Sequence, residues 1–190
     1  GTGETGEVLP LIDGVRWADV GTRVHEYGGK AYAVHHGVIV FSDRSDGRVY
    51  AFDTSEPRRG VRPLTTLSKV RYGDFWIADE RDLVYAVAED HSGEGEPVNS
   101  IVAIPLDGSA ARDDAAIVPV FGGTDFAQAP TVSPDGTKLA WISWNHPNMP
   151  WTYSQLHVAS LTFEGTIDQE VVLVARPGVC VYEPRWTLDG

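Results

Sequence analysis

One turn motif returns along the chain at a spacing that constrains the fold. Residues 130–136 read Pro-Thr-Val-Ser-Pro-Asp-Gly, and residues 184–190, which begin 54 positions later, read Pro-Arg-Trp-Thr-Leu-Asp-Gly. In the first copy, Pro134 and Gly136 stand at the positions where a tight turn needs them, and the second copy repeats the Asp-Gly step. A repeat of this length is too long for one hairpin. It is close to the ~40–45 residues or more that a four-stranded propeller blade occupies.

Short β-rich runs lie between such turns, and they fall into groups of four. The runs are 31–34, 38–41, 48–52 and 61–65; then 75–78, 83–88, 100–105 and 117–121; then 129–132, 139–144, 155–161 and 170–175. The second run of each group begins at Val38, Leu83 or Leu139. A β-sandwich also uses short strands, but it does not require a turn motif to return at blade spacing. We therefore predict an all-β fold, a partial β-propeller of four-stranded antiparallel blades, with no long helix between residues 30 and 175.

The predicted blades divide the chain into five parts. These are 1–20, the end of a preceding blade and a linker; 21–66, 67–122 and 123–176, three blades; and 177–190, the first strand of the next blade. Propellers close with about 4–8 blades, so three are too few. We expect the chain to be a fragment of a larger propeller, or to be completed by another copy of itself as a homo-oligomer.

The charge balance argues against two classes of partner. The chain has 15 Lys and Arg against 27 Asp and Glu, a net charge of −12. An acidic surface repels phosphate backbones and anionic lipids, so we expect neither nucleic acid nor membrane as a partner. The one cysteine, Cys180, stands between two valines. We expect it to be a buried apolar side chain in a cytoplasmic protein.

Two strings of residues resemble a known family. They are Thr-Arg-Val-His-Glu-Tyr-Gly-Gly at 22–29 and Trp-Asn-His-Pro-Asn-Met-Pro-Trp at 144–151. Both are similar to the propeller of bacterial prolyl oligopeptidase-family serine peptidases, the group labelled dipeptidyl aminopeptidase or acylaminoacyl peptidase. The segments Glu-Asp-His at 89–91, Gly-Glu-Pro-Val-Asn at 95–99 and Leu-Ala-Trp at 139–141 resemble the same group.

The resemblance implies a two-part enzyme in which the propeller restricts access to an α/β-hydrolase domain with a Ser-Asp-His triad. No serine of this chain lies in the Gly-x-Ser-x-Gly frame of a nucleophile elbow, so we assign no catalytic residue here. The expected role is to filter peptide substrates and to hold the hydrolase domain. The alternative is a stand-alone propeller that binds a protein or a small ligand and is not part of an enzyme.

Local spacing gives no metal site and nothing requires a cofactor. No two histidines stand four residues apart, and a single cysteine excludes paired thiolates. Residues 43–47, Asp-Arg-Ser-Asp-Gly, lack the alternating oxygen ligands and the closing Glu of a calcium loop, and they predict a hairpin turn.

The loops rich in charged, polar and aromatic residues are all loops that precede the first strand of a predicted blade or connect its second and third strands. In an antiparallel blade, the loop before the first strand and the loop between strands two and three emerge on the same face. We expect that face to carry the candidate substrate or interdomain residues: His25, Glu26, Tyr27, Asp90, His91, Glu96, Asn99, His146, Asn148 and Trp151.

Two of these loops allow a structural as well as a functional interpretation. The acidic loop from Glu89 to Glu96 either is simply solvated or attracts the positive N-terminus of a substrate. The apolar loop from Trp144 to Trp151 either packs on its own blade or meets a partner domain. The strand residues Trp141 and Trp186 are expected in the core.

Overall fold

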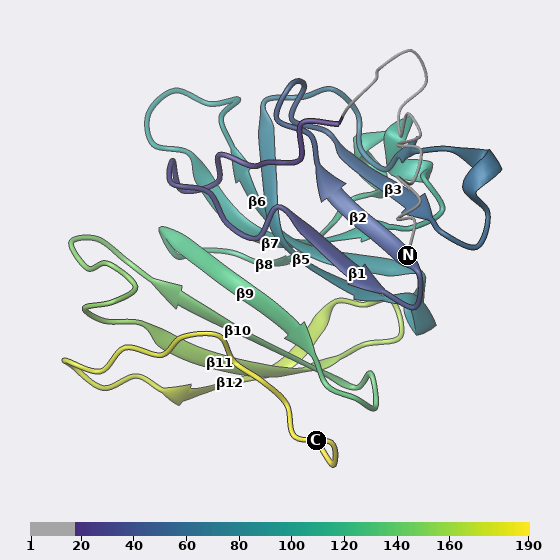
Figure 1. The fold of residues 1–190 in the computed structure, drawn as a ribbon. Coiled ribbons are helices and arrows are strands. Elements are labelled where there is room, and N and C mark those ends of the chain that lie inside the picture. The colour runs from purple at the N-terminus through teal and green to yellow at the C-terminus, as the bar shows by residue number, and fades with distance from the viewer. Residues whose placement is uncertain (1–17) are drawn as a thin grey trace, which may run out of the picture.

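The computed structural model describes residues 18–190 and contains three four-stranded antiparallel sheets (Figure 1). The strands are β1 (Tyr32–His35), β2 (Val38–Ser42), β3 (Val49–Asp53) and β4 (Arg62–Pro63); β5 (Val70–Ala78), β6 (Leu83–Asp90), β7 (Val98–Pro105) and β8 (Val118–Phe121); and β9 (Phe126–Val132), β10 (Lys138–Trp144), β11 (Gln155–Leu161) and β12 (Ile167–Val174). In every sheet the strands pair in chain order. The predicted fold class, a partial β-propeller of four-stranded blades, is confirmed.

Helix is nearly absent from the described residues. Only four 3-10 helices occur, each of three residues: η1 (Pro57–Arg59), η2 (Asp79–Arg81), η3 (Ser109–Ala111) and η4 (Asp114–Ala116). The prediction of no long helix between residues 30 and 175 is therefore confirmed. Within residues 18–190, no helix has the length and apolar character needed to cross a membrane.

The second strands begin at Val38, Leu83 and Lys138, within one residue of the predicted starts. The hairpin turns explain this agreement, because each places residues with positive φ between the first two strands. His36 and Gly37 have φ of 44° and 83°, Asp82 has 53°, and Gly136 has 70°. Such residues leave the extended conformation and fix where the next strand starts.

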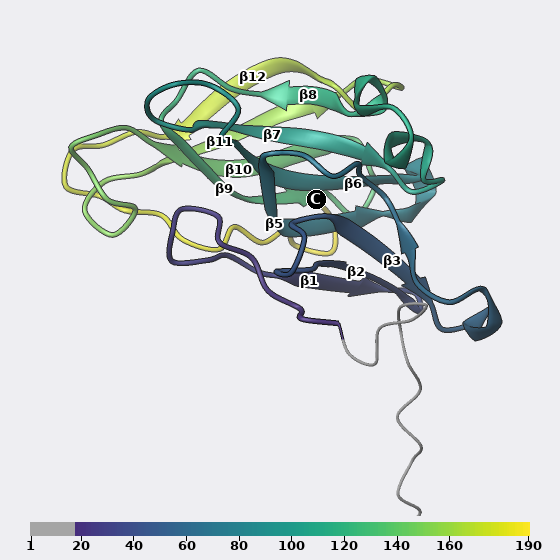
Figure 2. The ribbon, with the colours of Figure 1, turned by 90° about the horizontal axis from the view of Figure 1, so that it is seen from above.

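The sheets pack face to face, so that the middle sheet is covered on both sides (Figure 2). Strand β6 shows the consequence in its sequence, Leu-Val-Tyr-Ala-Val-Ala-Glu-Asp, which is apolar at six consecutive positions. Val84 and Ala86 pack in the core shared with the first sheet, whereas Tyr85 packs in the core shared with the third. A strand covered on both faces has no reason to alternate apolar and polar residues.

One carboxylate joins the three sheets near their first strands. Asp74, in β5, accepts the backbone N–H of Lys30 on Oδ1 at 2.6 Å and that of Ala129 on Oδ2 at 3.1 Å. Lys30 precedes β1 and Ala129 lies in β9. Asp74 and Ala129 both have positive φ, and the pairing register shifts at both places. The first strands of the second and third sheets, β5 and β9, therefore each have a β-bulge where Asp74 joins them. These linked bulges fix the relative position of the blades.

The residues after β12 differ from two expectations. Cys180 is exposed, so its predicted burial is wrong. Around it the backbone is held by Ser154, whose Oγ accepts from Val181 N at 2.8 Å, and the segment lies on the surface instead of inside a sheet. Trp141 is fully buried, as predicted, but Trp186 is only partly buried and donates from Nε1 to Thr131 O at 3.0 Å. The described residues from 175 onward contain no strand, and their assignment to a next blade stays a prediction.

The expected last strand of a preceding blade falls within residues 1–17, outside the described residues. The described chain begins beside the first sheet, where Val20 makes an isolated antiparallel bridge with Asp43. Asp43 lies in the turn predicted from residues 43–47. Its Oδ1 accepts from Ser45 N at 2.8 Å, as in an Asx turn.

Candidate functional site

A pocket of about 270 Å³ lies where loops of all three sheets meet. We call it the loop-face pocket; it is lined by His25, Glu26, Glu89, Glu96, Pro97, Asn99, Asp125, Phe126 and His146. Five of these are candidate residues from the sequence: His25, Glu26, Glu96, Asn99 and His146. They come from the loop before β1, the β6–β7 loop, the start of β7 and the β10–β11 loop. Loops that precede a first strand and loops that connect second and third strands therefore meet at one end of the sheets.

A tight turn brings His25 to the pocket. His25 and Glu26 have φ of 56° and 63°, and Gly28 has 83°. The turn is closed by Gly28 N, which donates to Val24 O at 2.9 Å. His25 N points the other way and donates to Glu89 Oε2 at 2.6 Å. The loop before the first sheet is thereby attached to the second sheet.

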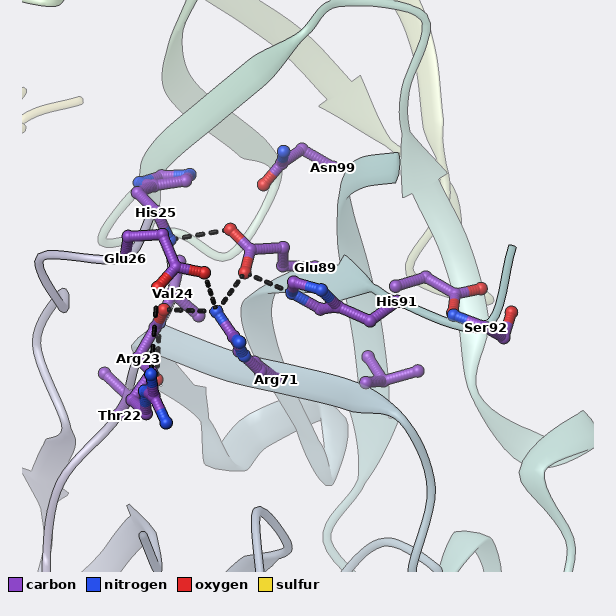
Figure 3. Close-up of polar contacts among 12 residues, drawn as sticks. Thr22, Arg23, Val24, His25, Glu26, Arg71, Glu89, His91, Ser92 and Asn99 are labelled. Carbon is purple, nitrogen blue, oxygen red and sulfur yellow. Dashed lines mark hydrogen bonds and ion pairs between the residues drawn. The ribbon is translucent and has the colours of Figure 1, made fainter. Parts of the chain in front are cut away.

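Glu89 is buried, and it is the centre of a polar cluster (Figure 3). Its Oε1 accepts from Arg71 Nη1 at 3.1 Å and lies 2.6 Å from His91 Nε2. Arg71 Nη1 also donates to Glu26 Oε1 at 2.6 Å. A buried carboxylate is tolerated when it is paired and hydrogen-bonded in this way. Glu89 is therefore a structural anchor whose charge Arg71 compensates.

The Arg71 guanidinium also changes the pKa of Glu26, which lines the pocket. The hydrogen bond from Arg71, followed by its charge, lowers the pKa of Glu26. Glu26 is thus a carboxylate at neutral pH, but one already engaged by a cation. Sequence analysis did not find Arg71, because an arginine inside β5 carries no signal that it reaches two loops.

Two buried polar atoms beside the pocket, His25 Nε2 and Asn99 Oδ1, make no hydrogen bond of good geometry with any described residue. The Asn99 side chain is nevertheless close enough to the His25 ring to raise its pKa slightly, against the larger effect of burial. Figure 3 shows the Asn99 side chain directed toward the His25 ring. Asn99 is held by its other side-chain atom, Nδ2, which donates to Asp125 O at 2.8 Å. Burial lowers the pKa of His25, so its ring is neutral at pH 7. An unpartnered buried polar atom costs about 1–3 kcal/mol, and a ligand or a water that bonds to it removes that cost.

An aromatic wall closes one side of the pocket. Phe126 stacks on Trp144 with ring centroids 5.2 Å apart and planes at 13°, and the His25 ring meets both edge-on at 5.5 Å. His146 lies edge-on to Phe126 at 5.0 Å. Its loop is fixed by Asp125, whose Oδ2 accepts from His146 N at 2.8 Å. The pocket thus has an apolar, aromatic side and an acidic side.

The remaining candidate residues lie outside the pocket lining. His91 packs behind it against Glu89, Asp90 accepts from Ser92 N at 2.7 Å within its own loop, and Asn148 donates to Asn145 O at 3.2 Å. Tyr27 and Trp151 are exposed, at 57% and 64%. The apolar 144–151 loop therefore divides: Trp144 is buried in its own blade, whereas Trp151 projects into solvent.

A second polar chain lies inside the third sheet. Ser143 Oγ is 2.8 Å from His157 Nε2, and His157 Nδ1 is 2.7 Å from Glu170 Oε1. The order Ser-His-Glu is that of a hydrolase triad, but Ser143 has no exposed surface and lies in the middle of β10 instead of on an elbow. No substrate reaches this hydroxyl, so the chain of hydrogen bonds is structural.

No family model matches the chain, and no curated protein matches it either. Among solved structures, a puromycin hydrolase mutant complexed with PGG is 34% identical over 96% of this chain, with a TM-score of 0.84. A puromycin-hydrolyzing peptidase from Mycobacterium tuberculosis is 35% identical over 90%, with a TM-score of 0.78. The chain spans 29% and 28% of these two proteins. A TolB protein from Agrobacterium tumefaciens, at 14% identity and a TM-score of 0.54, shares the fold alone.

The three four-stranded sheets, joined through Asp74, define the class of the chain, which is a segment of a β-propeller. The match to the puromycin hydrolases, which extends over nearly the whole chain, is more specific. In sequence and in fold, the segment is similar to the propeller region of puromycin hydrolases, which are peptidases of the prolyl oligopeptidase family.

Proposed function

We propose that this chain is the non-catalytic propeller segment of a prolyl oligopeptidase-like serine peptidase, and that the loop-face pocket faces its substrate chamber. In this role the segment gates peptide substrates and docks the α/β-hydrolase domain. The observation that carries the proposal is the loop-face pocket itself. Loops of three blades converge there around two buried polar atoms without partners and an acidic rim.

Glu96 is the pocket group best placed to bind a positive charge. Glu89 and Glu26 are engaged by Arg71, and Asp125 fixes the backbone of His146. Glu96 is exposed and makes no hydrogen bond or ion pair with any residue between 18 and 190. A carboxylate without a protein cation at the edge of a partly apolar pocket suits the α-amino group of a peptide.

Asn99 Oδ1 and His25 Nε2 are suited to bind the peptide backbone that follows the α-amino group. Asn99 Oδ1 accepts only, and the neutral His25 ring offers either a donor or an acceptor at Nε2, according to its tautomer. A peptide backbone supplies an N–H and a C=O close to its amino end. Phe126, which is stacked on the buried Trp144, then borders the first side chain.

The exposed aromatic residues supply the docking surface. Tyr27 and Trp151 lie on loops of the same end of the sheets, and Met149 in the same loop as Trp151 is exposed by about a third. Aromatic residues and methionine are enriched in the cores of protein interfaces. We assign this surface to the hydrolase domain of the parent protein.

Replacement of Glu96 in the full-length protein tests the proposed substrate contact. Glu96→Gln removes one charge, and we expect KM for peptides with a free N-terminus to rise about fivefold, which corresponds to the ~1 kcal/mol of a solvent-accessible ion pair. The same variant should leave KM for N-acetylated peptides unchanged. Steady-state kinetics on matched free and acetylated substrates measure both.

Glu94→Gln provides the matched control. Glu94 lies in the same exposed loop, two residues away, and does not line the pocket. If Glu94→Gln raises KM as much as Glu96→Gln, or if acetylated peptides are equally affected, then a general change of surface charge is responsible and the pocket is not the amino-group site.

A further inference from the structure

Three metal-ligating side chains meet at the end of the sheets opposite the loop-face pocket. His35 closes β1, His36 follows it in the hairpin, and Asp79 comes directly after β5. His35 Nε2 is 3.2 Å from Asp79 Oδ1, and His36 Nδ1 is 2.7 Å from Asp79 Oδ2. One ligand atom from each residue lies within 4.8 Å of the other two.

The hairpin geometry explains how two adjacent histidines face the same point. Successive side chains of a strand point to opposite faces, so two consecutive histidines in an extended chain cannot bind the same metal ion. Here His36 and Gly37 form the two-residue loop between β1 and β2, and both have positive φ. The change of backbone conformation at His36 places its ring beside that of His35, with centroids 3.9 Å apart.

The charge on Asp79 has no compensating cation in the described part of the chain. Its salt bridges are to the two histidines alone. The other group of three possible ligands, Glu26, Glu89 and His91, differs because Arg71 already occupies the position of the cation.

We propose that His35, His36 and Asp79 form a zinc site that connects the first two blades. Two imidazole nitrogens and one carboxylate oxygen are ligands that Zn²⁺ accepts in tetrahedral sites, and the fourth position is left for water. The three side chains are partly or largely exposed, so solvent reaches the point between them.

Sequence spacing did not reveal this site because the ligands do not share one element. Asp79 is 43 residues from His36 and belongs to the neighbouring blade. The three side chains come together only when the first two sheets pack face to face.

Isothermal titration of the tag-free full chain with ZnCl₂ tests the proposal. We expect one equivalent to bind at the three ligands, and Asp79→Asn to weaken binding at least tenfold. His36→Asn is the sharper variant, because Asn before Gly is the preferred sequence of a two-residue hairpin loop. This change removes a ligand while it favours the hairpin, so lost binding with an unchanged or higher melting temperature cannot be ascribed to unfolding.

His91→Gln is the control, since it removes the histidine of the other group. Zn²⁺ should bind to this variant as to the wild type, and should raise the melting temperature of both but not that of His36→Asn. The proposal is overturned if Zn²⁺ does not bind with saturation, if His36→Asn and Asp79→Asn bind as tightly as the wild type, or if binding is lost in His91→Gln.

Discussion

Two histidine-centred regions of this molecule look alike in chemistry and differ in access. In the third sheet, both nitrogens of His157 have a partner, Ser143 on one side and Glu170 on the other. In the loop-face pocket, His25 Nε2 has none among the described residues. In the complete chain Ser143 and His157 are buried and only Glu170 reaches the surface, whereas the incomplete one borders a pocket. The comparison teaches that a triad-like arrangement alone does not identify a site, whereas unpartnered polar atoms beside a cavity indicate one.

The packing around His157 explains what the buried chain does. His157 faces Trp141 across β10 and β11, and their rings stack 5.1 Å apart at 10°. Phe121 of the second sheet meets the same ring at 5.2 Å. His157 therefore fills space between the second and third blades, and its two hydrogen bonds satisfy the polar atoms that this position buries.

Among the changes that test this comparison, the largest expected effect is the loss of the His157 ring. His157→Ala leaves a cavity against Trp141 and leaves the Ser143 hydroxyl buried without its partner. We expect the free energy of unfolding of the chain to fall by about 3 kcal/mol or more, measured by urea denaturation. Glu170→Gln, which keeps an oxygen that can accept from the ring, is the matched control and should cost less than about 1 kcal/mol. Equal stability of His157→Ala and the wild type would show that the buried chain has no structural role.

Ser143→Ala should have a smaller effect. It leaves His157 Nε2 buried and without a partner, which costs about 1–3 kcal/mol in the same measurement. The chain should also take no label from a serine-directed fluorophosphonate, with or without this change, because Ser143 is inaccessible. Stoichiometric labelling of the wild type that disappears in Ser143→Ala would make the buried chain catalytic and reverse the comparison.

The fold was largely predictable because its determinants are local. The turn at residues 133–136 and the positive φ of Gly37 and Gly136 fix the strand starts, and the run of six apolar residues in β6 follows from packing on both faces. Cys180 shows the limit of this reasoning. Its apolar neighbours suggested burial, but burial depends on a packing partner, and the segment that holds Cys180 lies outside the sheets.

The site was predictable in position but not in its internal chemistry. Of the residues that the order of strands and loops placed on one face, His25, Glu26, Glu96, Asn99 and His146 line one pocket, and their role as a substrate or interdomain face stays a prediction. That order did not show that Arg71 neutralises Glu89, since that contact joins β5 to the end of β6 through side-chain geometry. Nor did it separate Trp144 from Trp151, because both side chains are apolar and only the packing of the folded blade determines which one is covered.

Those two tryptophans give the prediction with the smallest expected effect on stability. Trp151 is 64% exposed, so Trp151→Ala should change the free energy of unfolding of the chain by no more than about 0.5 kcal/mol. Trp144→Ala, at the end of β10 where that loop begins, is the control and should cost about 3–5 kcal/mol, since Trp144 is buried against Phe126. In the full-length protein, Trp151→Ala should lower kcat/KM for peptides if Trp151 contacts the hydrolase domain. Thermal melting of the chain and peptidase assays of the full-length variant separate the two roles. A folded variant with unchanged activity would remove Trp151 from the docking surface, and an unfolded one would place it in the core beside Trp144.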